Sequence, residues 1–497
     1  MIDRLVVANG LLLADAAAPA RHADLWIEDG LIREIGVPGQ FDRLEGVRMV
    51  DARDRLVIPG LVNAHSHGHG ALGRGAVDEV ALEGFLAASP AVNGHRGLAE
   101  LALSTTLNAV ELLKKGCTSI FDVSGEFPQP SVAGLHAVAH AYASVGVRAV
   151  VAPMMADRTL YAAYPALLAS LPSDLHAAMS ALHATPAQQM LATVRAAALA
   201  WPFDPRRVRL GLAPTIPLHC SDEFLRGCAA LSAEFDLPMQ THLAESRTQA
   251  HWGVRQYGHS LTAHLQQLGL LSPRLSVAHA IWVSDADIDL LAAAGVTAVH
   301  NPQSNLRLGS GIAPVRRMRE RGLRVALGSD GANTSDTQNL FEGMRLAAGL
   351  SRVVDHDDAR WLQPAEVMQM ATSDGASVFG WQAAAGAIGR IAPGAAADLV
   401  LLDLAAPVYV PYRDALRQLV HGENGAAVDR VLVGGRVVVD GGRVTTVDEA
   451  ALRGQAQAAA ERLDALNAEG RDLARALRPW VSAFCCNTIR TDKEIAS

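Results

Sequence analysis

The sequence has little of what marks several large protein classes. Aromatic residues make up only 5% of its 497 residues, and 51 acidic residues outweigh 43 basic ones, for a formal net charge of -8. This balance leaves no basic footprint for nucleic acid. No run of about 18 or more uncharged apolar residues is present, and Met1 to Arg4 lack the charged-then-apolar layout of a signal peptide. We therefore expect a cytoplasmic protein without nucleic-acid or membrane partners.

Cysteine is also scarce. The five cysteines do not show the CxxC spacing that tetrahedral zinc sites use; they are Cys117, Cys220, Cys228, Cys485 and Cys486. Because their number is odd and their spacing is irregular, we expect them to be reduced. Packing explains Cys220 and Cys228 more simply than metal binding does.

Short apolar runs, by contrast, fill both ends of the chain. A hydrophobic content of 50% and a charged content of 19% are ordinary for a globular protein. Residues 1–58 alternate β-rich runs with Asn9-Gly10 and Asp29-Gly30, which favour hairpin turns. Similar runs return in residues 386–447. Since neither end has enough strands to bury a core alone, we expect both to combine into one small β-sandwich.

Between the two ends, residues 59–385 alternate strand-length apolar runs with longer helical stretches, which is typical of βα units around a parallel sheet. The expected strands are 58–64, 118–123, 148–152, 208–213, 238–242, 276–279, 297–300 and 324–329. The predicted fold class is therefore α/β, a (β/α)8 TIM barrel with a small β-sandwich domain, and an open doubly wound sheet is the alternative. We expect a helical segment at 448–480 and a tail without an assigned role at 481–497.

Polar residues at the predicted strand ends carry the functional signal. His65 and His67 follow the first barrel strand as His-x-His, and alternate residues of a strand face the same side. Both imidazoles should therefore point into the barrel mouth at its C-terminal end, where barrel enzymes hold their active sites. His242, His279 and Asp330 end the fifth, sixth and eighth predicted strands.

Three imidazoles and one carboxylate delivered to one mouth suit a divalent ion with a position left for water. We expect Zn²⁺, with Fe²⁺ as the alternative, whereas a structural zinc would more often take cysteines. A bound divalent ion lowers the pKa of water from about 15.7 to about 7 and so supplies hydroxide at neutral pH. The pattern predicts metal-assisted hydrolysis.

Five segments, in order, resemble the amidohydrolase superfamily, specifically its cytosine deaminase, S-adenosylhomocysteine deaminase and triazine hydrolase branch. They are 59–67 (PGLVNAHSH), 241–246 (THLAES), 301–314 (NPQSNLRLGSGIAP), 327–331 (LGSDG) and 394–400 (GAAADLV). The resemblance implies one divalent metal held by His65, His67, His242 and Asp330. No lysine stands near Thr215, where binuclear members place a bridging lysine, and this departure favours a single metal.

The resemblance also implies catalytic roles. Glu245, three residues past His242, matches the proton shuttle of the family, and His279 matches the histidine that orients the water or polarises the bond under attack. Asp330 would bind metal and accept the proton of the attacking water, while Glu245 passes a proton to the ring nitrogen and then to the leaving group. A solvated carboxylate and a satisfied core histidine are the alternatives for Glu245 and His279.

Four further residues are candidates for the substrate pocket: His69, Thr215, Gln303 and Asn305. His69 extends the His-x-His pattern but should lie beyond strand geometry, so we expect it to line the pocket or bond backbone rather than bind metal. Asn305 and Gln303 follow the seventh strand, where they would either face substrate or, as turn residues often do, bond the backbone.

The predicted function is deamination of a small N-heterocycle such as a purine, pyrimidine, pterin or triazine. The alternatives are removal of chloride or an alkylamine from a triazine, cleavage of a urea or carbamate C–N bond, and a non-catalytic binding relative. Residues 85–93 lack the acid that holds ribose hydroxyls in the nucleoside branch, and Thr215 stands where that branch has histidine. We therefore predict a free heterocycle rather than a nucleoside as substrate. Relatives are often dimers or larger, so we expect a homo-oligomer.

Overall fold

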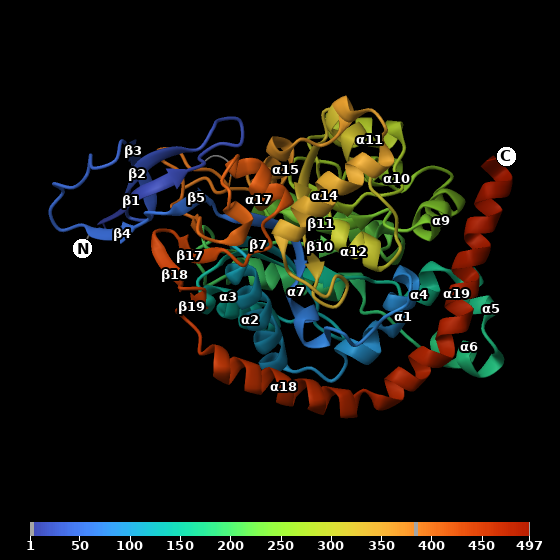
Figure 1. The fold of residues 1–497 in the computed structure, drawn as a ribbon. Helices are drawn as coiled ribbons and strands as arrows, with labels where there is room; N and C mark the ends of the chain where they lie inside the picture. The colour runs from blue at the N-terminus through green and yellow to red at the C-terminus, as the bar shows by residue number, and fades with distance from the viewer. Residues whose placement is uncertain (1–3, 382–385, 497) are drawn as a thin grey trace.

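Strands from both ends of the chain lie side by side at one edge of the molecule (Figure 1). This computed structural model describes residues 4–381 and 386–496, with side chains as far as Arg490. The shared sheet has the order β19-β18-β17-β16-β5-β1-β2-β3, with β4 paired to β1, and β16 runs antiparallel to β5. Its strands are β1 (Arg4–Leu12), β2 (Arg21–Glu28), β3 (Leu31–Gly36), β4 (Arg48–Asp51), β5 (Arg55–Pro59), β16 (Leu399–Asp403), β17 (Val428–Val433), β18 (Arg436–Asp440) and β19 (Arg443–Val444). A separate two-layered β-sandwich stays a prediction.

The two predicted hairpin turns have different outcomes. Asp29 and Gly30 both have positive φ angles, 52° and 76°, and join β2 to β3, as the Asp-Gly signal predicts. The turn predicted at Asn9-Gly10 is wrong, because β1 continues through both residues with a shift in register. A Cβ atom at Gly10 would lie 2.6 Å from Val57 Cγ2, so this glycine allows the close approach of β5.

Parallel strands form the central body of the molecule. They are β6 (Leu61–His67), β7 (Cys117–Ser124), β8 (Arg148–Met155), β9 (Val208–Leu210), β10 (Ala213–Pro214), β11 (Met239–Leu243), β12 (Leu275–His279), β13 (Thr297–His300), β14 (Arg324–Leu327) and β15 (Asp330–Gly331). Two sheets result, β10-β8-β7-β6-β15 with β9 on β8, and β11-β12-β13-β14. They adjoin where Leu212 bridges Met239, and β15 pairs with β6. The fold is α/β and TIM-barrel-like.

Each of the eight predicted barrel segments contains a strand, but the first has a different boundary. Residues 58 and 59 belong to β5 of the shared sheet, and β6 begins only at Leu61. Between them, a Cβ atom at Gly60 would lie 2.1 Å from Thr118 Oγ1. Glycine therefore lets the chain pass tightly from one sheet to the other.

Helices surround the parallel strands (Figure 1). Several begin at a serine whose hydroxyl accepts a hydrogen bond from a backbone N–H of the first turn, as for Ser131, Ser221, Ser246, Ser260 and Ser284. The helices before the C-terminal pair are α1 (Leu82–Asn93), α2 (Leu98–Lys114), α3 (Val132–Val145), α4 (Leu160–Ala163), α5 (Pro165–Ser170), α6 (Ser173–Ser180), α7 (Ala187–Leu199), α8 (Asp222–Phe235), α9 (Arg247–Tyr257), α10 (Leu261–Gln267), α11 (Asp285–Ala293), α12 (Pro302–Arg307), α13 (Val315–Glu320), α14 (Leu340–Val354), α15 (Pro364–Met370), α16 (Ser373–Ala376) and α17 (Ala415–His421). None of the helices in the described ranges is both long enough and apolar enough to cross a bilayer.

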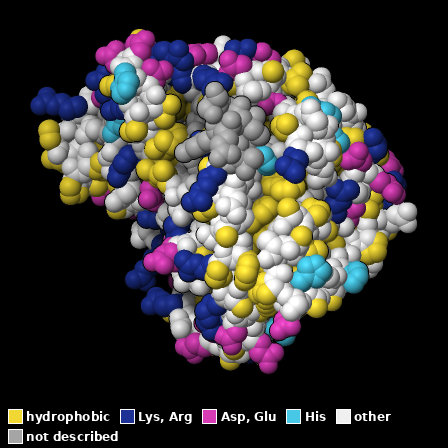
Figure 2. All heavy atoms as spheres, turned by 90° about the vertical axis from the view of Figure 1, so that its right-hand side faces the viewer, with side chains coloured by type: hydrophobic (Ala, Val, Ile, Leu, Met, Phe, Trp, Pro, Cys, Tyr) yellow, Lys and Arg dark blue, Asp and Glu magenta, His cyan; other side chains and the backbone are white. Residues whose placement is uncertain are grey.

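The C-terminal region differs from the prediction. Two helices, α18 (Glu449–Leu466) and α19 (Ala468–Ala496), wrap around one margin of the molecule, so no boundary separates a helical segment from a tail at residue 481 (Figure 1). Leu477, Val481, Phe484 and Thr488 are buried at helical spacing, and α19 packs against α1, α5 and α9. This apolar stripe explains why the helix continues. Figure 2 shows the face that carries α19, where acidic and basic side chains are interspersed with hydrophobic atoms.

A buried ion pair joins the parallel strands to the shared sheet. Arg148, at the start of β8, donates to both carboxylate oxygens of Asp398, over 2.7 and 3.1 Å. The side chains are 13% and 1% exposed, and Asp398 also accepts a hydrogen bond from the Gly434 N–H. Bidentate pairs of this kind are geometrically specific. The interaction therefore sets the position of β16 against β8.

Replacing Asp398 by Asn should destabilise the protein by about 3–5 kcal/mol, because Arg148 would keep its charge without a buried counter-charge. The matched control is Asp289→Asn, whose partner Arg321 forms a pair with side chains 53% and 36% exposed. The control substitution should lower the free energy of unfolding by less than about 1 kcal/mol. Denaturant unfolding followed by circular dichroism measures both, and equal shifts in the two variants would contradict the assigned role.

Candidate active site

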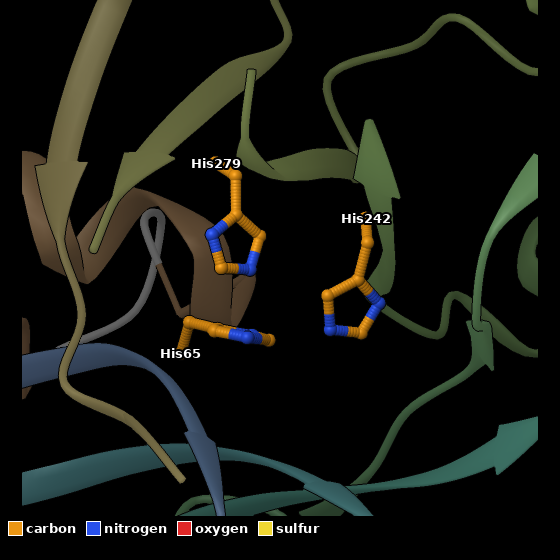
Figure 3. Close-up of side chains that lie close together, drawn as sticks. All are labelled: His65, His242 and His279. Atoms are coloured by element: carbon orange, nitrogen blue, oxygen red, sulfur yellow. The ribbon is translucent and has the colours of Figure 1, made fainter. Parts of the chain in front are cut away.

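The polar strand ends predicted from the sequence converge on one buried centre. His65 and His67 come from β6, His242 from β11, His279 from the end of β12 and Asp330 from β15. All five side chains are buried. Figure 3 shows His65, His242 and His279 turned toward one another from different strands.

The candidate ligand atoms lie close together. The Nε2 atom of His67 is 3.2 Å from the Nε2 atom of His242 and 3.2 Å from Asp330 Oδ1. His65 Nε2 is also 3.2 Å from Asp330 Oδ1. In two overlapping groups, His65 with His242 and His279, and His65 with His67 and Asp330, all ligand atoms lie within 4.8 Å of one another.

Hydrogen bonds on the outer side of each ring fix the protonation of these histidines. The Nδ1 atoms donate to Gln240 Oε1 for His65 (2.6 Å), Val123 O for His67 (2.8 Å), Thr215 O for His242 (2.6 Å) and Asn305 Oδ1 for His279 (2.8 Å). Because an oxygen acceptor requires a proton on Nδ1, each neutral ring presents a bare Nε2 lone pair to the centre. This is the arrangement that surrounds metal-binding histidines.

The bare nitrogens fit a cation. Two lone pairs 3.2 Å apart, on His67 and His242, repel each other unless a positive charge lies between them. Ligands about 2.0 Å from one tetrahedral zinc ion would be about 3.3 Å apart, which agrees with the measured separations. The Nε2 atom of His279 is also buried and has no hydrogen-bond partner in the described part of the chain. The residues present therefore fit a divalent metal ion.

The backbone is strained at the same positions. Ala244, His279 and Asp330 have φ angles of 44°, 68° and 61°, in the left-handed region that residues other than glycine rarely adopt. Each such residue costs about 1–3 kcal/mol and persists where the surroundings require it, often at functional sites. Here the strain accompanies the turn of the chain at the ends of β11 and β12 and at β15.

Two carboxyl groups of the site have opposite environments. Burial raises the pKa of Glu245 well above its usual value, and the negative charges of Asp330 and Glu83 add to this effect. Burial would also raise the pKa of Asp330, but the imidazoles of His65 and His67, whose Nε2 atoms lie 3.2 Å from its Oδ1 atom, outweigh burial and hold that pKa well below its usual value. Glu245 Oε2 lies 3.6 Å from His279 Nε2. The pKa values of two carboxyl groups beside the same centre are thus shifted in opposite directions, as acid–base chemistry requires.

A narrow cavity of about 60 Å³ opens onto this centre. The candidate reactive residues His67, His242, Glu245, His279 and Asp330 are among its lining residues. Its other lining residues are His69, Leu82, Phe85, Leu86, Ser89, Asn93, Met154, Thr215, Ile216, Leu308, Asn333 and Thr334. Five of these residues belong to α1, of which Leu82, Phe85 and Leu86 are apolar and Ser89 and Asn93 are polar.

The four predicted pocket residues divide into two groups. His69 and Thr215 line the cavity; His69 also accepts a hydrogen bond from Gly125 N at 2.9 Å, so it bonds backbone while it lines the pocket. Gln303 and Asn305 are not among the described lining residues of this cavity, and a pocket role for them stays a prediction. Gln303 Nε2 donates to the Asn339 carbonyl, and Asn305 holds His279.

Sequence reasoning missed residues that hold the reactive groups in place. Gln240 anchors His65, and its position two residues before His242, on the same strand face, was the available signal. Thr334 donates to Asp330 Oδ2 at 2.9 Å. Glu83 of α1 is an acidic residue just before residues 85–93, the segment in which the sequence has no acid. It is buried and accepts hydrogen bonds from Ser246 Oγ and Cys485 Sγ. It does not belong to the described cavity lining.

Known proteins share this fold and sequence over nearly their whole length. The sequence profile of the Amidohydrolase family matches residues 56–438. The chain is 30% identical to 5'-deoxyadenosine deaminase of Methanothermobacter thermautotrophicus, over 93% of this chain and 100% of the relative. It is 33% identical to a 5-methylthioadenosine/S-adenosylhomocysteine deaminase of Nitratidesulfovibrio vulgaris, over 91% and 96%.

A solved structure agrees with these relatives. An adenosine deaminase from Xanthomonas campestris, with bound zinc, superposes with a TM-score of 0.80 at 27% identity, over 93% of this chain and 98% of that protein. The match of the family profile covers more than half of the chain, and the two relatives align with 93% and 91% of it. The chain therefore belongs to the amidohydrolase family.

Proposed function

We propose that this amidohydrolase is a metal-dependent aminohydrolase that releases ammonia from an aminated N-heterocycle. The observation that carries the proposal is the convergence of bare histidine Nε2 atoms and Asp330, with Glu245 3.6 Å from His279. The relatives at 30% identity or more are named as deaminases of adenosine-type compounds, which supports hydrolysis of a C–N bond.

One divalent metal is part of the proposal, and His65, His67, His242 and Asp330 would hold it. Zinc is proposed because imidazole nitrogens and one carboxylate suit it and because the Xanthomonas deaminase contains it. When bound, such an ion supplies hydroxide at neutral pH by lowering the pKa of water. The hydrogen bonds from the Nδ1 atoms of His65, His67 and His242 to Gln240, Val123 and Thr215 hold the rings in this orientation.

The residues of this chain would then handle the protons. The ionised Asp330 accepts a proton from the attacking water, whose oxygen forms the new bond to the amidine carbon. The protonated Glu245 donates to the ring nitrogen, then takes the remaining hydroxyl proton of the adduct and passes it to the departing amine as the C–N bond breaks, so that ammonia leaves. The proton that Asp330 accepted from water then returns to Glu245, which restores both carboxyl groups. His279, held by Asn305, points its bare Nε2 atom toward the same space and would orient the water or the bond under attack.

The substrate proposed is a compact free heterocycle. The part of the cavity wall that α1 supplies has no carboxylate among its described lining residues: it has Leu82, Phe85 and Leu86 beside Ser89 and Asn93, and Glu83 turns toward Ser246. A ribose hydroxyl is recognised strongly only where a polar partner awaits it. A nucleoside is the second candidate, because the curated relatives carry the names of nucleoside deaminases.

Three wider features complete the proposal. We propose that the parallel strands act as one closed (β/α)8 barrel, which the β15–β6 pairing and the Leu212–Met239 bridge support, beside a β-sandwich domain of 1–58 and 386–447. A cytoplasmic location is supported by five cysteines that are all free. A homo-oligomer is proposed from the family resemblance alone.

Metal analysis should find one equivalent of divalent metal per chain, because a single centre collects the ligand atoms. His65→Ala should lose both the metal and ammonia release while circular dichroism shows an intact fold, since the ligands lie at the strand ends rather than in the supporting core. His140→Ala, at an exposed position of α3, is the control and should keep both. Two equivalents in fully active protein would refute a single-metal centre.

Replacing Glu245 by Gln should leave metal content near normal and reduce turnover by about 10² to 10⁴, the usual worth of a positioned acid–base group. Asp330→Asn should be at least as harmful. Glu223→Gln, an exposed acid on α8, should have no effect on turnover. If Glu245→Gln turned over at the wild-type rate, Glu245 would not be the proton shuttle.

The substrate proposal predicts a ratio of specificity constants. With metal-loaded protein, kcat/KM for the best free purine, pyrimidine, pterin or triazine should exceed that for adenosine, methylthioadenosine and S-adenosylhomocysteine by at least about tenfold, or 1.4 kcal/mol. Ammonia release measures deamination, and chloride or alkylamine release measures the triazine alternative. A tenfold preference for any of the three nucleosides would favour the second candidate instead.

A further inference from the structure

A second cavity has a volume of about 720 Å³. It is lined by residues that follow β11, β12 and β13 and by residues of α13 and α14. It is much larger than the cavity over the histidines and does not include any of the proposed metal ligands. Its apolar lining residues include Ile281, Val283, Ile312, Val315, Leu350 and Leu362. A volume in the range of about 300–1,000 Å³ is typical of small-molecule sites. We call this space the outer cavity.

Arginines give the outer cavity an excess of positive charge. Four of them line it, and Asp355 is the one carboxylate among its described lining residues. Three of the arginines have acidic partners: Arg316 binds Glu366, Arg317 binds Asp285, and Arg360 binds Glu320 and Asp355. The remaining arginine, Arg247, has no acidic partner among the residues that the structure describes. Its charge is therefore available to a ligand.

Arg247 is held in position by an aromatic ring. Its guanidinium carbon lies 4.3 Å from the centre of the Trp282 ring, a cation–π contact that leaves the N–H groups free to donate. Trp282 is itself fixed, since its Nε1 donates to Ser310 O at 2.8 Å and its backbone N–H donates to Ala244 O at 3.0 Å. The cation is thus placed in advance at the edge of an apolar space.

A histidine with an unpaired buried nitrogen is also among the residues that line the outer cavity. His300, at the end of β13, is 3% exposed and is one of the lining residues. Its Nδ1 atom has no hydrogen-bond partner in the described part of the chain. Buried polar atoms nearly always have a partner, so an unpaired nitrogen beside a cavity indicates a place for a ligand atom.

From these three features we infer that the outer cavity binds a small amphipathic anion. Its carboxylate, sulfonate or similar group would pair with Arg247, and its apolar or aromatic body would lie against Trp282 and the aliphatic wall. His300 would provide a further polar contact. This inference does not depend on the proposed deaminase activity, because it uses none of the residues assigned to the reaction.

A fluorescent aryl sulfonate, 1-anilinonaphthalene-8-sulfonate, is the probe for this site. We expect saturable binding to the metal-loaded wild-type protein at one site per chain. The uncharged analogue N-phenyl-1-naphthylamine should bind at least about tenfold more weakly, since it lacks the group that pairs with Arg247. This comparison uses only wild-type protein and therefore does not depend on the folding of a variant.

Variants then locate the site. Arg247→Met should raise the Kd of the sulfonate at least about tenfold, whereas Arg247→Lys should keep most of the affinity. The matched control is Arg317→Met, because Arg317 lines the same cavity but is paired with Asp285, and it should change the Kd less than twofold.

Three results would overturn the inference. Equal affinity for the sulfonate and the uncharged analogue would show an apolar groove without anion recognition. Equal effects of Arg247→Met and Arg317→Met would place the probe elsewhere. Absence of saturable binding, together with self-association at the protein concentration used, would mean that a second copy covers the cavity.

Discussion

The site depends on one electrostatic constraint: buried nitrogen and oxygen lone pairs, which repel one another, lie close together. Four imidazoles present bare Nε2 atoms to a small buried volume, and two of these atoms are only 3.2 Å apart. Such a cluster is unfavourable by itself and becomes favourable around a cation. Each Nδ1 atom has a hydrogen-bond partner on the side of the ring that faces away from the centre. The Nε2 atoms, which face the centre, are therefore the ones whose lone pairs stay bare.

Much of the surrounding structure serves to maintain this arrangement. Gln240 reaches His65 from β11, which belongs to the other sheet of parallel strands, while backbone carbonyls of Val123 and Thr215 hold His67 and His242. Left-handed backbone at His279 and Asp330 aims their side chains inward at a local energetic cost. The parallel strands can bear that cost, because each of these residues is paired with a neighbouring strand, His279 with Leu243 of β11 and Asp330 with Ser66 of β6.

The helices outside the strands determine what can approach the centre. α1 supplies part of the wall of the narrow cavity, and α19 packs against α1, with Cys485 in contact with Glu83. On the other side, Arg247 and Trp282 belong to the outer cavity, although they directly follow the segments that carry Glu245 and His279. The two spaces therefore share their supporting loops while offering different chemistry.

The sequence by itself determined the parallel strands and the set of reactive residues. Strand runs ending in His242, His279 and Asp330 were readable because β periodicity and the order of βα units are local properties. Tertiary structure alone decided how Asn305 and Gln303 are used, that Gly10 lies within β1, and that residues after 480 continue a helix. These outcomes depend on partners distant in sequence, such as Val57 against Gly10 and α1 against α19, and contacts of that kind leave no local pattern.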